Sequence, residues 1–420
     1  MFQNSGLSLD QAPPIKVVLR FFLSGSIFGV VAGIFLFFFN NDINSNYALI
    51  LTHLLTLGVM ASFMFGALFQ MLPVLGGVHI KAPTLESLRV NYTLIFGLIF
   101  LLNAFYFGYT ALYIFASLFL GFAIFKTAYL MLKELKDIEH NSSSRGMAIS
   151  LVSLSILAII GIVLLYIRAG YNINLDYIWL KSMHFSFGLF GWIALLIISV
   201  SFQVIEMFYV TPPYNKVYAK YLPCVILGVL ILNFILSFVS SKAFYIFETV
   251  TILIVAIHAL YTLIRLKQKK RPVMDATIYF WILGLSSFIL FALIFIAKYF
   301  VNIPTLLLAA LFSYFALSIV FAMAYKIVPF LVWFHLNAQG YFDAPMMHEV
   351  TKPSYAKKNF YIFFASFILS ILASFYPILW HFVSILFTIS FFMLLLNIYS
   401  AMHKYQYVLK HSKKFELNIK

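Results

Sequence analysis

The feature that most constrains this chain is a succession of long apolar stretches that are separated by short polar segments. A helix of about 20 residues crosses a hydrocarbon core about 30 Å thick, so each stretch is long enough to span a bilayer. Lipid offers backbone polar groups no partner, so spanning segments must be helices rather than open strands. We therefore expect an all-α polytopic membrane bundle of about twelve transmembrane helices. The predicted spans are residues 17–39, 46–72, 91–110, 111–133, 147–167, 178–208, 218–240, 243–265, 276–300, 304–331, 358–379 and 381–403.

Composition agrees with a membrane environment. The chain is 63% hydrophobic and 10% charged, which is more apolar surface than a soluble core can hide. Its polar start, MFQNSGLSLDQ, lacks the basic stretch and cleavage site of a signal peptide, so we expect the first span to remain in the mature protein. The single cysteine, Cys224, excludes an intrachain disulfide and a multi-thiolate metal site.

The net charge of +15 is distributed unevenly over the predicted loops. If the N-terminus is cytoplasmic, most Lys and Arg residues fall on the cytoplasmic side, including the run RLKQKKRP at 265–272. This is the positive-inside pattern, and it predicts a multi-pass protein of the bacterial cytoplasmic (inner) membrane with both termini in the cytoplasm. The basic loops then face anionic lipid, so the expected partner is the bilayer and not a nucleic acid.

No linker divides the chain, so residues 1–420 are predicted to form a single transmembrane domain. Three related segments end its second, sixth and tenth spans: FQMLPVL (69–75), FQVIEMF (202–208) and YKIVPFL (325–331). Segments of this kind that recur four spans apart indicate a pseudo-threefold plan of four-helix repeats. The repeats are expected at approximately residues 15–133, 147–265 and 276–403.

Two histidines stand near the outer ends of long spans: His53 in the second and His184 in the sixth. Ionisable groups inside a membrane usually face the bundle interior and mark functional sites. Neutral imidazole is also the commonest metal ligand and the usual axial ligand of haem iron. Glycines follow both histidines and would let a neighbouring helix or a flat macrocycle approach closely. The alternative is that both histidines only form hydrogen bonds between helices.

The twelve-span plan, the cytoplasmic termini and the histidines that open spans 2 and 6 resemble subunit I of haem–copper oxidases and the related NnrS-type membrane proteins. The topology is similar over the whole chain. The motifs are similar only over residues 53–77, 184–214 and 304–336.

The resemblance implies that His53 is a haem ligand and that His184 is a metal or haem ligand. It also implies that Arg168 and Lys181, on the same side of the membrane, hold the haem propionates. His381, at the outer start of the last span, is a candidate for a further metal ligand, for example to copper.

The chain departs from the oxidases where their oxygen chemistry takes place. Span 7, YAKYLPCVILGVLILNFILSFVS, lacks the copper-binding histidine pair. Span 10 has no histidine in its outer or middle part, and His335 falls at its cytoplasmic end. These absences argue against terminal oxidase activity, and the NnrS-type comparison fits better. No catalytic residue is assigned, so whether the chain is an enzyme stays open.

Three functions therefore remain. The first is a haem-binding membrane protein, with copper as a second candidate cofactor. It would act in respiration, electron transfer or nitric oxide and metal stress, with respiratory-chain subunits as candidate partners. The second is a small-solute or metal transporter whose path is lined by Gln70, Gln203, Glu206 and Lys326, with a Glu206–Lys326 pair as its gate. The third is a cofactor-free assembly factor for respiratory complexes.

Overall fold

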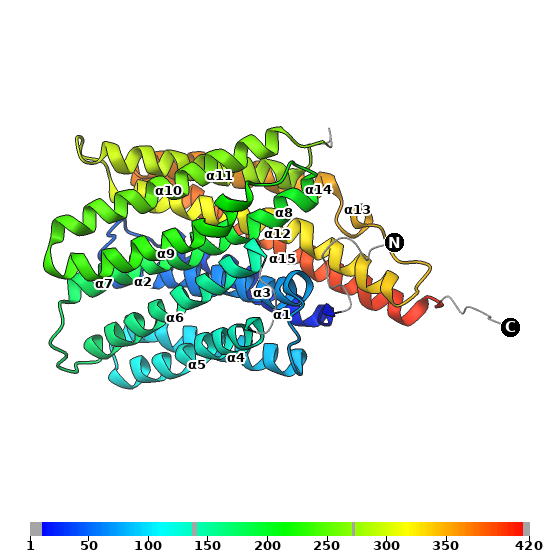
Figure 1. The fold of residues 1–420 in the computed structure, drawn as a ribbon, viewed down its shortest axis with the longest axis horizontal. Coiled ribbons are helices and arrows are strands. Elements are labelled where there is room, and N and C mark those ends of the chain that lie inside the picture. Colours follow the sequence, from blue (N-terminus) through cyan, green and yellow to red (C-terminus); the bar gives the residue numbers. More distant parts are fainter. Residues whose placement is uncertain (1–10, 137–140, 271–273, 415–420) are drawn as a thin grey trace.

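The computed structural model describes residues 11–136, 141–270 and 274–414, and these form a bundle of long helices (Figure 1). The structure is 84% helical and has no strand within the described residues. Twelve of its helical segments are long and apolar enough to cross a membrane. The expected all-α polytopic membrane bundle is thereby confirmed. Residues 1–10 and 271–273, on which parts of the signal-peptide and basic-loop predictions rest, lie outside the described residues.

Spans 2 and 6 are each built from three consecutive helical segments. Span 2 consists of α2 (Asn46–His53), the π-helix η2 (Leu54–Ala61) and α3 (Ser62–Gly76). Span 6 consists of α7 (Tyr177–Ser186), the π-helix η3 (Phe187–Ala194) and α8 (Leu195–Tyr209). The other spans are α1 (Ile15–Phe37), α4 (Pro83–Phe107), α5 (Thr110–Leu135), α6 (Ser142–Arg168), α9 (Lys216–Val239), α10 (Ser241–Lys267), α11 (Ala276–Ala297), α12 (Thr305–Ala338), α14 (Pro353–Ala373) and η4–α15 (Pro377–Leu379 and Trp380–His411).

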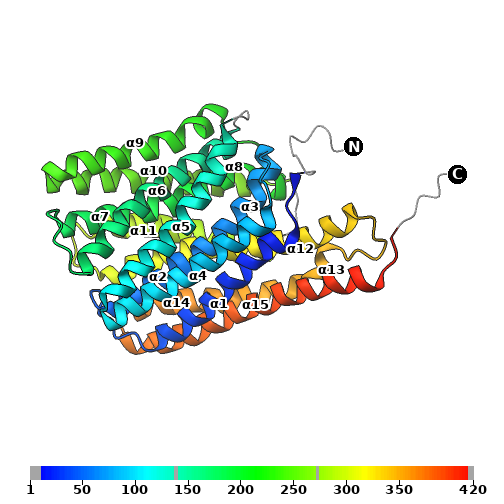
Figure 2. The ribbon, with the colours of Figure 1, turned by 90° about the horizontal axis from the view of Figure 1, so that it is seen from below.

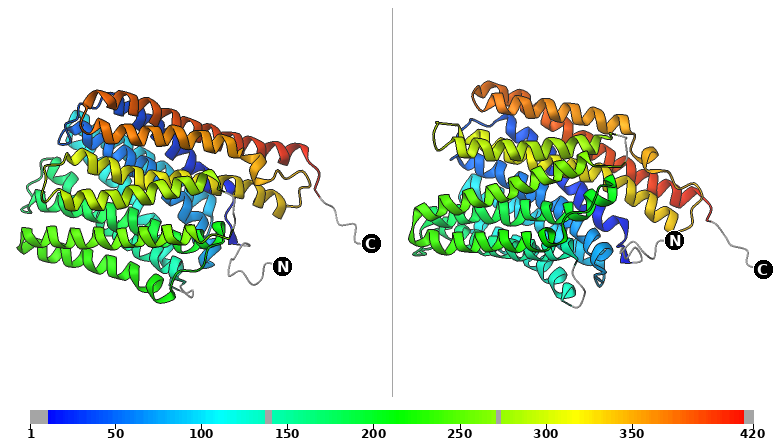
Figure 3. Two further views of the ribbon diagram at one scale, coloured as in Figure 1. Left: turned by 90° about the horizontal axis from the view of Figure 1, so that it is seen from above. Right: turned by 45° about the horizontal axis from the view of Figure 1, so that its top comes forward.

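The start of α1 and the end of α15 lie at the same end of the bundle, which we call the terminal side (Figure 2). The other end is the opposite side. Both α12 and α15 extend past the neighbouring helices on the terminal side, where the short helix α13 (Met347–Val350) lies beside them (Figure 3). The order of the spans places His53 and His184, near the starts of spans 2 and 6, toward the opposite side.

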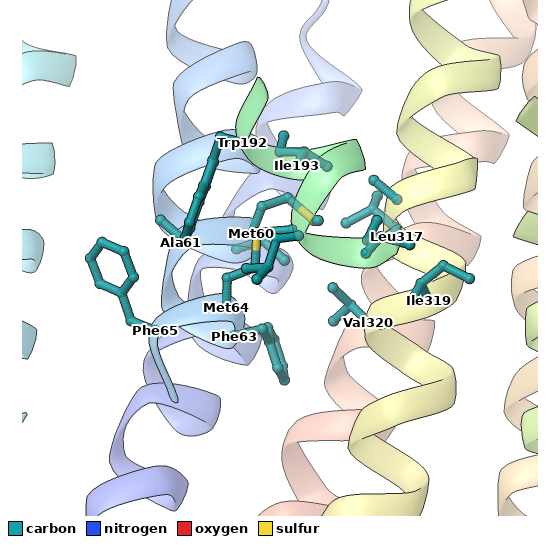
Figure 4. Close-up of a cluster of buried hydrophobic side chains, with 14 of the residues drawn as sticks. Met60, Ala61, Phe63, Met64, Phe65, Trp192, Ile193, Leu317, Ile319 and Val320 are labelled. Carbon is teal, nitrogen blue, oxygen red and sulfur yellow. The ribbon is translucent and has the colours of Figure 1, made fainter. Parts of the chain in front are cut away.

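Spans 2, 6 and 10 meet in the interior. Spans 6 and 10 are the most buried, with 83% and 78% of their apolar windows inside the protein, compared with 33% for spans 5 and 7. Figure 4 shows Met60 and Phe65 of span 2, Trp192 of span 6, and Leu317 and Val320 of span 10 in one apolar cluster. These are the second spans of the three predicted repeats.

The first and last spans pack side by side (Figure 2), and glycines permit their close approach. A Cβ added at Gly29 would overlap the Phe391 ring, and one added at Gly33 would overlap Thr388. The Ser384 hydroxyl of α15 also donates to the Gly33 carbonyl at 2.7 Å. Small residues four apart on one face are the usual means of close helix contact in lipid.

The predicted spans agree with the helices, but several helices continue further into the polar regions. Helix α4 begins at Pro83, eight residues before the expected start, because Glu86 in its first turn pairs with Arg89 at 3.0 Å and with Lys126 of α5 at 3.1 Å. Helix α12 continues to Ala338. Hydropathy detects only the apolar centre of a helix. A predicted span therefore leaves out charged end turns, even where ion pairs keep them helical.

We expect Gly29→Val to destabilise the protein strongly. Overpacking a tight contact costs about 1–3 kcal/mol, and here the new side chain would have to displace Phe391. Thermal unfolding in detergent measures the effect as a lower midpoint. Gly228→Val in α9 is the matched control, because a Cβ there meets nothing within 4 Å. Equal losses in both variants would contradict the assignment of Gly29 to a packing contact.

Candidate functional site

His53 is the last residue of α2 and is held by a backbone hydrogen bond. Its Nδ1 atom lies 2.8 Å from the Leu49 carbonyl oxygen, one turn earlier. A carbonyl only accepts hydrogen bonds, so Nδ1 carries the proton and Nε2 of the neutral ring keeps a free lone pair. Histidines that bind metals are commonly oriented in this way, with one nitrogen donating to a backbone carbonyl.

His184 lies in the last turn of α7 and packs against Gly161 of α6. A Cβ added at Gly161 would lie 2.9 Å from His184 Cε1, so only glycine leaves room for the ring in this position. The buried ring also interacts with the Leu157 backbone, one turn before Gly161 on the same helix. Its orientation is therefore set by α6.

The two rings converge from spans that are distant in the sequence. Their centroids are 6.4 Å apart, and their planes are inclined by only 25°. Phe105 of α4 lies against His53 at 5.2 Å and closes that side of the pair. The structure therefore brings together the two histidines that the sequence singled out.

A cavity of about 640 Å³ reaches both histidines, and its walls are largely apolar. This volume lies within the range of about 300–1,000 Å³ that is typical of pockets for small molecules and cofactors. Gly121, Gly161 and Gly188 contribute flat wall segments from three different spans. The few polar groups in the wall include Thr52, Thr56, Ser117, Ser313 and Tyr177.

Arg168 and Lys181, the two basic residues that the sequence analysis singled out, both line this cavity. The Arg168 guanidinium donates to Asn46 Oδ1 at 3.2 Å and to the Tyr177 hydroxyl at 3.4 Å, and it lies over the Phe105 ring at 5.8 Å. Lys181 is exposed. The cavity thus carries two cations beside its pair of neutral imidazoles.

The π-helices are the part of the site that sequence reasoning missed. The segment η2 begins directly after His53, and η3 begins three residues after His184. Single π-turns often accompany functional sites, because the wider turn reorients neighbouring side chains. Gln70 and Gln203 each lie nine residues after the end of their π-helix, so the two spans align at the glutamines while the histidines differ by two positions. The glycines within the two segments were the only feature of the sequence that could have indicated these π-helices.

His381 is not part of this cavity. Its ring stacks on Phe37 at 4.7 Å, and its Nδ1 atom has no hydrogen-bond partner in the described residues. Nowhere in the described part of the chain do three or more His, Cys, Asp or Glu side chains form a group that could hold a metal ion. Any metal at this site would therefore depend on the two imidazoles of His53 and His184.

The expected Glu206–Lys326 gate is wrong. Lys326 Nζ pairs instead with Asp275 Oδ2 of α11 at 3.0 Å, and Glu206 Oε1 accepts the Tyr214 backbone N–H at 2.8 Å. Asp275 immediately precedes α11, where hydropathy showed only the end of a loop, so its contact with Lys326 could not be predicted from the sequence. Of the four predicted path residues, which also include Gln70 and Gln203, none lines the large cavity.

Comparison with known proteins does not identify this chain: no family model matches it, and no curated protein is similar to it in sequence.

The Asp275–Lys326 pair should make stability depend on pH. Burial by itself would raise the pKa of the Asp275 carboxyl, but the Lys326 ammonium and hydrogen bonds from Thr277, Lys326 and Ile278 hold that pKa below the ordinary aspartate value. A lowered carboxyl pKa adds stability at neutral pH that is lost as the pH falls through the folded-state pKa. We expect Asp275→Asn to lower the thermal midpoint by a few degrees at pH 7, with the difference shrinking under acid conditions.

The matched control is Asp176→Asn. Asp176 caps α7 as Asp275 caps α11, and asparagine can replace aspartate in both caps, but Asp176 has no ion pair in the described structure. Thermal unfolding of both variants at several pH values separates the ion pair from the cap. An equal and pH-independent effect of the two substitutions would contradict the prediction.

Proposed function

We propose that the protein binds haem in the cavity between spans 2 and 6, where His53 and His184 would hold it. The observation that carries this proposal is the convergence of the two imidazole rings, whose centroids are 6.4 Å apart, at the wall of a cofactor-sized cavity. Histidine–metal bonds are about 2 Å long, so both rings could bind one metal ion at this separation.

The chain supplies the other groups that a haem requires. The aromatic and aliphatic lining of the cavity suits the apolar faces of a flat ring. Arg168 and Lys181 provide cations for two propionates, and Tyr177 and Asn46 hold the Arg168 guanidinium in place. Two histidine ligands would supply a one-electron redox centre, with the Leu49 carbonyl increasing the electron donation of His53.

This site supports a role in electron transfer, respiration or nitric oxide and metal stress in a bacterial cytoplasmic membrane. The bias of Lys and Arg toward the terminal side supports cytoplasmic termini, so the histidines would lie toward the periplasmic surface. Imidazole also suits copper, which keeps copper bound by the same two histidines as a second candidate. The NnrS-type resemblance agrees with this proposal, and respiratory subunits are the expected partners.

The transporter alternative has less support. Its path residues do not line the cavity, and its expected gate is replaced by the Asp275–Lys326 pair. A cofactor-free assembly factor would need the two histidines only as contacts between helices. In that case the free Nε2 of His53, which the bond from Nδ1 to the Leu49 carbonyl leaves available, would serve no purpose.

An absorption spectrum of the detergent-purified protein, before and after titration with haem, tests the proposal. We expect a Soret band from the wild type, and we expect His53→Ala and His184→Ala each to lose most of it because each removes an imidazole that would hold the haem. Gly161→Val should act in the same direction by displacing the His184 ring. Metal analysis of the same samples distinguishes iron from copper.

The control is His381→Ala, which removes another histidine near the same end of the bundle but outside the cavity. It should keep the full spectrum. A wild-type protein that stays colourless and metal-free after titration would refute cofactor binding, as would a band that survives in both His53→Ala and His184→Ala.

A further inference from the structure

Glu248 is a buried carboxyl group that the site above does not use. It lies in α10, about two turns from the end of the helix on the opposite side of the bundle, and only 2% of it is exposed. Its neighbours are Ser186 of span 6 and Asn233 of span 7. Ser186 and His184 are two residues apart on one helix, so they point to different faces of it. His184 faces the cavity and Ser186 contacts Glu248, so span 6 separates Glu248 from the cavity.

Hydrogen bonds satisfy only one of the two carboxyl oxygens. Ser186 Oγ donates to Oε2 at 2.7 Å, and Asn233 Nδ2 lies 3.5 Å from the same oxygen. Glu248 Oε1 is buried without a partner in the described structure, and so is Asn233 Oδ1. Both unpartnered atoms are acceptors, so a donor is missing from this group.

No cation compensates a charge on Glu248, which forms no ion pair among the described residues. On span 6, Lys181 and His184 face the cavity. On α10 itself, Lys242 and Tyr245 are exposed. The His258 ring is hydrogen-bonded to Ser201 and Tyr218. The other titratable groups on α10 and on the elements packed around it lie toward helix ends or on the terminal side: Glu206, Tyr209, Lys216, Tyr218, Lys220, Tyr221, Cys224, Tyr261, Arg265, Lys267, Tyr279, Lys298 and Tyr299.

Glu248 differs from Glu86 and Asp275 in its burial and in its lack of a cationic partner among the described residues. Glu86 has two cationic partners and Asp275 has one, whereas Glu248 is more deeply buried and has none. An isolated ionised carboxylate in such a place is very costly, and the group becomes neutral instead. A proton on Oε1 would supply the missing donor beside the Asn233 amide.

We propose that Glu248 is a proton-binding site within the membrane, formed with Ser186 and Asn233, which exchanges its proton with water on the side opposite the termini. This goes beyond the proposed function, because it involves no bound cofactor. In chemical terms the site takes a proton, and the carboxyl is a neutral acid at pH 7.

The direction of exchange follows from the end of the bundle that is nearer to Glu248. Ser237 lies one turn beyond Asn233 on α9 and accepts a hydrogen bond from Trp179 Nε1 at 3.0 Å. Ser240, which caps α9 one turn further on, is exposed. Toward the terminal side, the next titratable group on α10 is His258, ten residues away, which corresponds to about 15 Å of helix.

Infrared spectroscopy in an ester-free detergent tests the proposal. We expect the wild type at pH 7 to show a carboxylic acid C=O band that shifts in D₂O and is lost in Glu248→Gln. Glu86→Gln is the matched control: because Glu86 is paired with two cations, its replacement should leave the band unchanged. Size-exclusion chromatography confirms that each variant is folded.

Deuterium exchange of the same band tests the route. Ser237→Val should slow the exchange, whereas Thr262→Val, in the His258 cluster toward the terminal side, should not. A wild type without the band at pH 7, or a band that persists in Glu248→Gln, would overturn the proton site. Loss of the band when sodium replaces choline in the buffer would also overturn it, since Glu248 would then bind a metal cation. Slower exchange in Thr262→Val alone would overturn the direction of access.

Discussion

The backbone hydrogen bond of a helix in hydrocarbon is the interaction on which the rest of this structure depends. Because lipid cannot satisfy N–H and C=O groups, each span must pair its own backbone, and the chain becomes a set of helices joined by short capped loops. Polar side chains then have only the spaces between helices in which to lie. This is why the histidines, the buried carboxyls and the cavity all occur where spans meet.

The two π-helices are exceptions to regular α-helical pairing, and both occur in central spans beside the cavity. A π-turn places an extra residue in each turn, so it changes the direction in which the following side chains point. In spans 2 and 6 this happens just after His53 and His184. The wide turns, together with Gly161, allow two large rings and a cavity to coexist in the interior of a closely packed bundle.

The charged groups of the bundle fall into two classes. Glu86 pairs with Arg89 within its own helix, whereas the Glu86–Lys126 and Asp275–Lys326 pairs tie neighbouring spans together. Glu248 is deeper and is held only by a hydroxyl and an amide. The first class contributes to architecture, whereas the second has the features of a site that binds and releases a proton. His258 resembles neither class, because hydroxyl groups occupy both of its ring nitrogens.

The sequence by itself determined the number and order of the spans and the depth of His53 and His184, because the length of an apolar stretch and its distance from the loops set position along the membrane normal. The tertiary structure alone decided which way each helix is rotated. Rotation brought His53 to His184, paired Lys326 with Asp275 rather than with Glu206, and left Glu248 without a cation. It is set by side-chain packing between spans far apart in the chain, and hydropathy along one helix carries no information about that packing.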